Sequence, residues 1–151
     1  YDEEFDNNDL SSLHLIAYLR GEPVATLRIR FFAGFAKIER VCVMKHVRGG
    51  SLVKLMIETA VDIIARKGYT HAIGYIQKRL VPFWKQLGFL PREGREGFRF
   101  SDYDYVECER RFAIRSDAIT MDSDPYVVMR PEGEWDHENV LDRSASRPAV
   151  A

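Results

Sequence analysis

The sequence predicts an α/β (α+β) fold: a hairpin of antiparallel strands followed by a strand–helix–strand unit. Two β-like runs on either side of a Gly21-Glu22-Pro23 turn, the second of them alternating, predict the hairpin. The strand–helix–strand order is indicated by a β-like run over Ala36–Met44, a helical stripe over Ser51–Lys67 and a second β-like run over Thr70–Ile76. Strands joined by a crossover helix pair in parallel, so we expect one parallel pair in the sheet.

The first hairpin strand is predicted over Leu13–Leu19, after an acidic lead-in, Tyr1 to Asp9, that we expect to be a loop. The second is predicted over Val24–Phe32 and alternates. One face would carry Ala25, Leu27, Ile29 and Phe31, and the other Thr26, Arg28 and Arg30. Both strands are therefore expected to be half-buried. The third strand follows the turn Ala33-Gly34.

Two helices are predicted. The helix over Ser51–Lys67 ends at Gly68, and its apolar stripe consists of Leu52, Leu55, Met56, Ala60, Ile63 and Ile64. A shorter helix is predicted over Leu80–Leu87, because Pro82 lies in its first turn and Gly88 follows its end.

The rest of the chain is less regular. Leu90–Arg99 is charged and Gly-rich, and Asp104–Ile114 predicts one more strand, preceded by an aromatic segment. Pro131–Ala151 is poor in apolar residues, so we expect an irregular tail with Trp135 as its only anchor. We predict one domain over residues 1–114 and a C-terminal extension over 115–151.

Composition limits the function classes. A chain of 151 residues, 46% of them hydrophobic, can bury one sizeable core. A net charge of -1, from 22 basic and 23 acidic residues, gives no field to attract nucleic acid or an anionic membrane. No apolar run reaches the roughly 20 residues that span a bilayer. We expect a soluble, cytoplasmic protein with neither nucleic-acid nor membrane partners.

The cysteines and histidines do not predict a metal site. Cys42 and Cys108 lie in separate β-like runs without Cys-x-x-Cys spacing, which suits a reducing compartment. The histidines are scattered along the chain at His14, His46, His71 and His137. We therefore expect no bound metal.

The turn Arg48-Gly49-Gly50 joins a predicted strand to a predicted helix. A glycine turn that feeds a helix N-terminus collects free backbone N–H groups and the positive end of the helix dipole, which suits a phosphate. Glycine also occurs in such turns for steric reasons alone, so both interpretations stay open at this point.

Five motifs lie in order within Leu13–Phe89: His-Leu-Ile-Ala-Tyr, Gly-Glu-Pro-Val-Ala-Thr-Leu-Arg, Ile-Glu-Arg-Val-Cys-Val, Val-Arg-Gly-Gly and Leu-Val-Pro-Phe-Trp-Lys-Gln-Leu-Gly-Phe. Together, and most specifically through the last of them, this part of the chain resembles the GCN5-related N-acetyltransferase (GNAT) superfamily. It implies a mixed, mostly antiparallel sheet with a splayed parallel strand pair, flanked by helices. It also implies that acetyl-CoA or another acyl-CoA binds in the splay and passes its acyl group directly to an amine. Family members usually have a strand and two helices before the first hairpin, and we expect these to be missing here.

The resemblance also implies a set of residues that bind the acyl donor. The family's pyrophosphate loop corresponds to Arg48, Gly49, Gly50, Ser51, Leu52 and Val53, with Lys54 following. Ser51 replaces a glycine of that motif and Val53 a small residue. The pantetheine arm would meet Val41, Cys42 and Val43, with the Val43 N–H facing the thioester oxygen. Gln77 replaces an asparagine that binds the arm, and Phe83 and Trp84 complete the set.

Glu39 is the candidate catalytic base. An amine acceptor is protonated near pH 7 and must lose a proton before it attacks the thioester. Some family members use this position for proton removal, and strand alternation predicts that Glu39 shares a face with Val41 and Val43. The alternative is that Glu39 forms an ion pair with Arg28, Arg30 or Arg40 and stabilises the sheet. The sequence leaves both open.

Trp84 occupies the position of a tyrosine that often protonates the departing thiolate in this family. An indole cannot supply that proton, which we expect to cost about 10- to 100-fold in rate. Tyr75 is a substitute candidate, although core packing is the alternative for both aromatics. His46 is expected to be a solvated turn residue. Lys78, Arg79 and Arg92 would either meet the outer phosphates or form a solvated face.

The resulting functional prediction is an N-acyltransferase that takes an acyl group, most simply acetyl, from acyl-CoA to an amine of a small molecule or peptide. Two alternatives stay open. One is a transferase of the same fold that uses acyl carrier protein, and the other is a non-catalytic acyl-CoA-binding domain. A homodimer formed by edge-strand pairing or exchange of the last strand is a further expectation.

Overall fold

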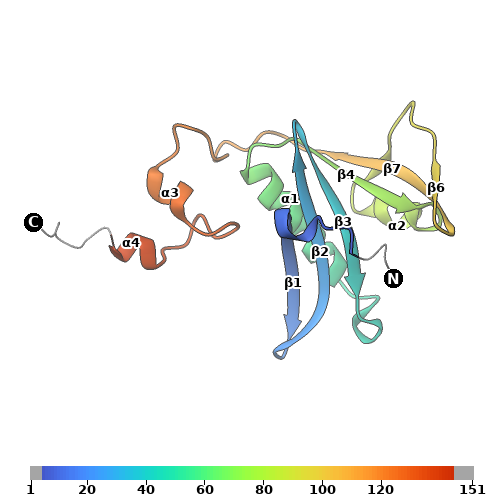
Figure 1. The fold of residues 1–151 in the computed structure, drawn as a ribbon, viewed down its shortest axis with the longest axis horizontal. Helices are drawn as coiled ribbons and strands as arrows, with labels where there is room; N and C mark the ends of the chain where they lie inside the picture. Colours follow the sequence, from blue (N-terminus) through green and yellow to red (C-terminus); the bar gives the residue numbers. More distant parts are fainter. Residues whose placement is uncertain (1–4, 145–151) are drawn as a thin grey trace, which may run out of the picture.

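The computed structural model describes residues 5–144. Within them one mixed sheet runs in the order β1-β2-β3-β4-β7-β5, and β6 pairs with β7 (Figure 1). The strands are β1 Leu13–Leu19, β2 Glu22–Phe32, β3 Phe35–Val43, β4 His71–Gln77, β5 Leu90–Pro91, β6 Phe98–Phe100 and β7 Tyr103–Arg111. The α-helices are α1 Leu52–Arg66, α2 Val81–Gln86, α3 Pro125–Met129 and α4 Val140–Ser144. Short 3₁₀ turns lie at Asp9–Ser11, Lys45–Val47 and Lys78–Leu80.

The parallel pair and its splay are confirmed. β3 and β4 are parallel neighbours, but they pair only at Ala36–Ala72 and Lys37–Ile73, near their amino ends. All other strand pairs are antiparallel. Beyond Lys37 the two strands separate, so a gap opens between their carboxyl ends, where ligands collect in sheets with parallel strands.

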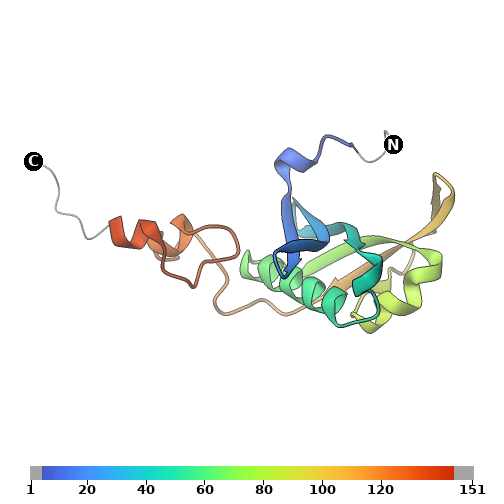
Figure 2. The same cartoon turned by 90° about the horizontal axis from the view of Figure 1, so that it is seen from below.

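Both core-forming helices lie on one face of the sheet (Figure 2). Ile57 and Ile64 of α1 are fully buried in a cluster with Leu27 and Ile29 of β2, and the segment after α2 adds Phe89. The predicted stripe of α1 is confirmed except at Leu55, which is exposed. Its side chain projects away from the line of Ile57, Ala60 and Ile64 that faces the sheet.

The hairpin turn is one residue earlier than predicted. Arg20 and Gly21 both have positive φ, 53° and 85°, whereas Glu22 and Pro23 already belong to β2. Two left-handed residues make a tight turn whose twist matches that of the flanking strands, which explains the shift. β1 coincides with its predicted range, Leu13–Leu19.

The prediction that β2 is half-buried is wrong, because Arg28 on its polar face is only 2% exposed. Its guanidinium donates to Asp6, Asp9 and Glu39 over 2.6 to 2.9 Å. The three carboxylates satisfy a charge that could not otherwise be buried. Asp6 and Asp9 belong to the acidic lead-in, which therefore lies on the sheet face opposite α1 (Figure 2). Its residues 1–4 lie outside the described residues.

The C-terminal extension contacts the end of α1. The Ile119 N–H donates to the Arg66 carbonyl over 2.7 Å, and the Arg66 guanidinium bonds to Asp117 and Asp136. Trp135 is buried, so the predicted anchor is confirmed. The predicted irregular tail is interrupted by α4, and its residues 145–151 lie outside the described part. The boundary at residue 114 stays a prediction.

Among residues 5–144, none of the helices combines the length and the hydrophobicity that crossing a membrane would require.

Candidate active site

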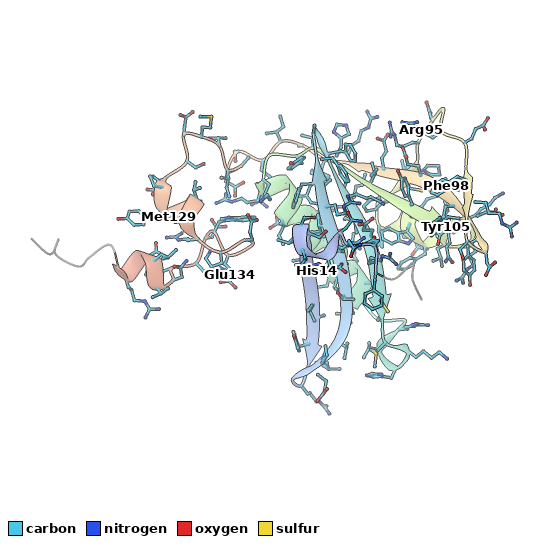
Figure 3. All side chains as sticks on the ribbon, in the orientation of Figure 1. His14, Arg95, Phe98, Tyr105, Met129 and Glu134 are labelled. Carbon is cyan, nitrogen blue, oxygen red and sulfur yellow. The ribbon has the colours of Figure 1, made fainter. Side chains whose placement is uncertain are left out.

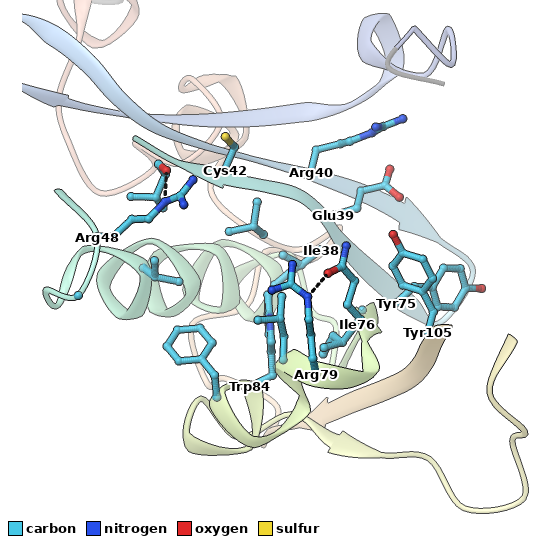
Figure 4. Close-up of a pocket in the computed structure, with 18 of the residues that line it drawn as sticks. Ile38, Glu39, Arg40, Cys42, Arg48, Tyr75, Ile76, Arg79, Trp84 and Tyr105 are labelled. Atoms are coloured by element: carbon cyan, nitrogen blue, oxygen red, sulfur yellow. Dashed lines mark hydrogen bonds between the residues drawn. The ribbon is translucent and has the colours of Figure 1, made fainter. Parts of the chain in front are cut away.

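A cleft of about 710 Å³ opens where β3 and β4 separate (Figure 4). It gathers side chains from β3, β4, α2 and β7 and from the turn before α1. Of the predicted donor-binding and catalytic residues, those that line the cleft are Glu39, Val41, Cys42, Val43, Arg48, Gly49, Gly50, Val53, Gln77, Phe83 and Trp84. Ser51, Leu52 and Lys54 do not line it, but they form the N-cap and first turn of α1 beside it.

The turn before α1 has the open backbone that the sequence predicts. Gly49 has φ of 86°, and a Cβ added at Gly49 or Gly50 would meet no atom within 4 Å. Ser51 caps α1 without a side-chain hydrogen bond. The first N–H groups of a helix have no partner within it, so those of the first turn of α1 can bind an anion.

Arg48 ties this turn to the end of β3. Its Nε donates to the Val43 carbonyl over 2.9 Å, as drawn in Figure 4. The Met44 N–H donates instead to Val24 on β2, over 2.9 Å. Because successive backbone groups of a strand point to opposite sides, the N–H and carbonyl of Val43 point away from β2, into the gap between β3 and β4.

The predicted alternation along β3 is wrong at Arg40. This residue has φ of 53°, and the pairing shifts between Thr26–Cys42 and Arg28–Glu39, so β3 carries one extra residue opposite Leu27. Such a bulge reverses the alternation. Val41 and Val43 pack on the core with Ile38, whereas Glu39 lies on the opposite face of the sheet.

Glu39 is in short contact with two cations, and a third, Arg30, lies 4.0 Å away. One carboxylate oxygen accepts from Arg28 over 2.7 and 2.9 Å, and the other lies 2.6 Å from Lys37 Nζ. Its side chain is 14% exposed and lines the cleft. The ion pair with Arg28 that the sequence left open is therefore present. A carboxylate has about four lone-pair positions, so these contacts leave capacity for a further proton or donor.

Residues 1–89 match the model of the acetyltransferase (GNAT) family. The chain belongs to the GNAT family. Two Bacillus subtilis relatives are similar to it: the uncharacterized protein YyaT, 31% identical over 87 residues, and the uncharacterized N-acetyltransferase YjcF, 34% identical over 92 residues. Each match covers 58% of this chain, and the chain spans 59% of YyaT and 63% of YjcF.

Among solved structures, an acyl-CoA N-acyltransferase from Pseudomonas aeruginosa is similar, with 25% sequence identity and a TM-score of 0.62. The match covers 71% of this chain and 74% of that one. The mixed sheet with a splayed parallel pair is thus the GNAT fold, as the resemblance in Leu13–Phe89 implied.

Trp84 and the substitute acid candidate Tyr75 differ in their surroundings in this GNAT domain. Trp84 packs edge-on against Phe89, with ring centroids 5.2 Å apart, and is buried, so the core-packing interpretation is confirmed for it. For Tyr75 that interpretation is wrong, because the residue is 43% exposed. Its ring lies under Lys37 Nζ at 4.3 Å and on the face that carries no core helix. His46 is exposed in the Lys45–Val47 turn, as predicted.

The basic residues predicted near the outer phosphates divide into two groups. Arg79 lines the cleft and donates from Nε to the Gln77 side-chain oxygen over 2.9 Å, and Lys78 and Arg79 border a second hollow with Tyr103. Arg92 instead pairs with Glu107 on β7. Arg92 is therefore part of a paired surface away from the cleft.

The sequence missed several lining residues, among them Ile38, Arg40, Gly74, Ile76, Leu80 and Tyr105. Tyr105 is the most informative. It reaches the cleft because β7 inserts beside β4, with Tyr105 opposite Gln77. The aromatic segment before the last predicted strand is the only signal in the sequence that could have pointed to it.

Proposed function

We propose that this chain binds an acyl-CoA in the cleft between β3 and β4 and transfers the acyl group to an amine by direct attack. The proposal is carried by the cleft itself, which lies between the α1 N-terminus and Glu39. In Figure 4, Arg48 lies on one side of this cleft, and Glu39, Tyr75 and Tyr105 lie on the other. The solved neighbour named as an acyl-CoA N-acyltransferase supports the choice of donor.

The residues present fit a diphosphate at the start of α1. Backbone N–H groups of Ser51, Leu52 and Val53 would donate to it, and the open space at Gly49 and Gly50 leaves room for close approach. Ser51 adds a hydroxyl where the family has glycine. Val53 lines the cleft, so its larger side chain would border the diphosphate without filling the space beside Gly50.

The reacting end of the donor would lie between Val43 and Glu39. The Val43 N–H points into the gap and would stabilise the negative charge that develops on the thioester oxygen. The amine nitrogen forms a bond to the acyl carbon, the carbon–sulfur bond breaks, and the amine proton passes to Glu39 directly or through a water. Since a thiol has a pKa of about 8.5, the CoA thiolate can leave without an acid at Trp84.

Titration calorimetry with acetyl-CoA, followed by a thiol-release assay on a panel of primary amines, tests this function. Binding with thiol release that depends on the amine is the expected result. Binding without release on any amine would favour a non-catalytic domain. Absence of binding would remove the acyl-CoA proposal, and transfer from acyl carrier protein would then be the next assay.

Replacement of Arg48 by lysine is expected to weaken acetyl-CoA binding about tenfold. An arginine can hold the Val43 carbonyl through Nε and present its terminal nitrogens to a phosphate, whereas a lysine has one ammonium for both. Calorimetry measures the change. R20K, in the exposed β1–β2 turn, is the matched control and should bind like the wild type. Equal affinity of R48K and R20K would contradict a donor role for Arg48.

Replacement of Glu39 by glutamine is expected to lower kcat about 100-fold at pH 7 and less than about 10-fold at pH 9.5. A positioned base contributes 10²- to 10⁴-fold, but it matters less once the amine, with a reference pKa near 10.4, loses its proton to solvent. The measurement is the pH profile of kcat, with urea unfolding recorded in parallel.

The matched control is E107Q. Glu107 is 13% exposed, is paired with an arginine, and lies on the same sheet face without lining the cleft. A pH-independent loss in E39Q, accompanied by lower stability, would assign Glu39 to the ion-pair network alone.

A further inference from the structure

Four aromatic rings form a cluster at the β6–β7 end of the sheet: Tyr75, Phe98, Phe100 and Tyr105. Phe98 is the centre. Its ring lies 5.1 Å from Tyr75, edge to face, and 5.7 Å from Tyr105, stacked at 18°. Figure 3 shows Phe98 and Tyr105 close together, away from the body of α1. Phe98 is 40% exposed, and Tyr75 and Phe100 are exposed as well.

The strand register places the aromatic cluster and Glu39 on the same face. Tyr105 is directly opposite both Gln77 and Phe98, and Tyr75 is two residues from Gln77. On the neighbouring strand Lys37 pairs with Ile73, so Lys37 and Glu39 share the face of Tyr75. Residues two apart, or directly paired, point to one side of a sheet. This side is opposite to the one that α1 and α2 cover (Figure 2).

The aromatic cluster is continuous with the cleft. Tyr75 and Tyr105 line it together with Glu39, and Lys37 Nζ connects the two features because it lies over the Tyr75 ring and 2.6 Å from Glu39. The hairpin that carries Phe98 depends on a close approach, since a Cβ at Gly97 would lie 2.9 Å from the Tyr105 carbonyl oxygen. Phe98 is thus held against Tyr105 by the backbone.

We infer that the aromatic cluster is the acceptor subsite and that it takes primary amines with a flat aromatic group. The inference rests on the proposed function. An amine nitrogen placed at Glu39 leaves the rest of the molecule to extend past Lys37 and the edge of Tyr75 toward Phe98. A stacked ring there removes apolar surface from water on both partners and gains the geometry that aromatic pairs prefer. Exposed clusters of large apolar side chains mark binding surfaces in this way.

The test compares 2-phenylethylamine with ethylamine, which share the amine and differ in the ring. Calorimetry in the presence of saturating CoA is expected to give at least tenfold tighter binding of 2-phenylethylamine. F98A should abolish the difference without changing ethylamine binding or CoA affinity. Y126A is the matched control, because Tyr126 is 41% exposed but lies on α3, and it should keep the preference.

The outcomes separate the two proposals. If the wild type does not bind CoA, the proposed function is removed. The acceptor subsite can still be tested in that case, because the amine titration can be run on the free protein. Three results would overturn the acceptor subsite alone: the two amines bind equally well, neither binds, or the preference for 2-phenylethylamine survives in F98A. So would a second copy covering this face, seen as a dimer that F98A converts to monomer in sedimentation.

Discussion

Replacement of Ser51 by aspartate is expected to weaken acetyl-CoA binding about 30- to 150-fold while the domain stays at least as stable as the wild type. At an effective dielectric constant near 20, one charge 4 Å from another contributes up to about 4 kcal/mol, and solvent exposure lowers this to about 2–3 kcal/mol. A carboxylate at the start of α1 would repel a diphosphate bound at the N–H groups of the first turn.

The same substitution has the opposite effect on the helix. A negative charge near a helix N-terminus stabilises it by about 0.3–1 kcal/mol. Ser51 has φ of -75° and ψ of -2°, which is not the extended geometry of a capping side chain, so we expect no additional capping bond. Stability and binding should therefore change in opposite directions, which a simple loss of folding cannot produce.

S51N is the control for S51D, because asparagine has the shape of aspartate without its charge. It should bind acetyl-CoA within about threefold of the wild type. The defect of S51D should also shrink in 0.5 M salt, where the Debye length is only about 4 Å. If S51D and S51N bind equally well at low salt, the diphosphate does not lie at the start of α1.

The elements that the sequence predicted well are those specified by local patterns. The apolar stripe and the flanking Arg48-Gly49-Gly50 and Gly68 turns contain what is needed to predict α1. The splay between β3 and β4 came from the family resemblance instead, because no periodicity within Ala36–Met44 or Thr70–Ile76 indicates where two strands separate.

The features that the sequence did not predict depend on pairing between distant segments. The bulge at Arg40 exists only relative to β2, and arginine is not a residue that marks a left-handed backbone. It moved Glu39 away from the face of Val41. Tyr105 joined the cleft because β7 lies next to β4, which is a property of strand order. Burial of Arg28 required three carboxylates, one of them 22 residues earlier in the chain.

Replacement of Arg28 by methionine is expected to destabilise the domain by about 3–5 kcal/mol. Removing one member of a buried ion-pair network has this effect because the other members lose their shared partner. Here Asp6, Asp9 and Glu39 would all lose the Arg28 guanidinium. Asp6 would keep Arg40 at 3.3 Å, and Glu39 would keep Lys37 at 2.6 Å and Arg30 at 4.0 Å. Urea unfolding at pH 7 measures the change.

R30M is the matched control, since Arg30 lies two residues along the same strand and is more exposed. It approaches Glu39 only to 4.0 Å and lies over the Phe32 ring, so its loss should cost no more than about 1 kcal/mol. If R28M and R30M unfold at the same urea concentration, the three-carboxylate network does not contribute to stability.

The network also predicts how the effect of R28M depends on pH. Hydrogen bonds from Arg28 hold the pKa of Asp6 well below its ordinary value of 3.8. A depressed carboxylate pKa stabilises the folded state above the ordinary value, and this contribution is lost as the pH falls through the depressed value. The difference between wild type and R28M should therefore be constant from pH 7 to about pH 5 and shrink only in strong acid. If the stability difference between wild type and R28M disappears near pH 6, the titrating group is a histidine and not Asp6.

R28K should lose about as much stability as R28M, because one ammonium cannot replace the five N–H donors by which Arg28 joins the lead-in, β2 and Glu39.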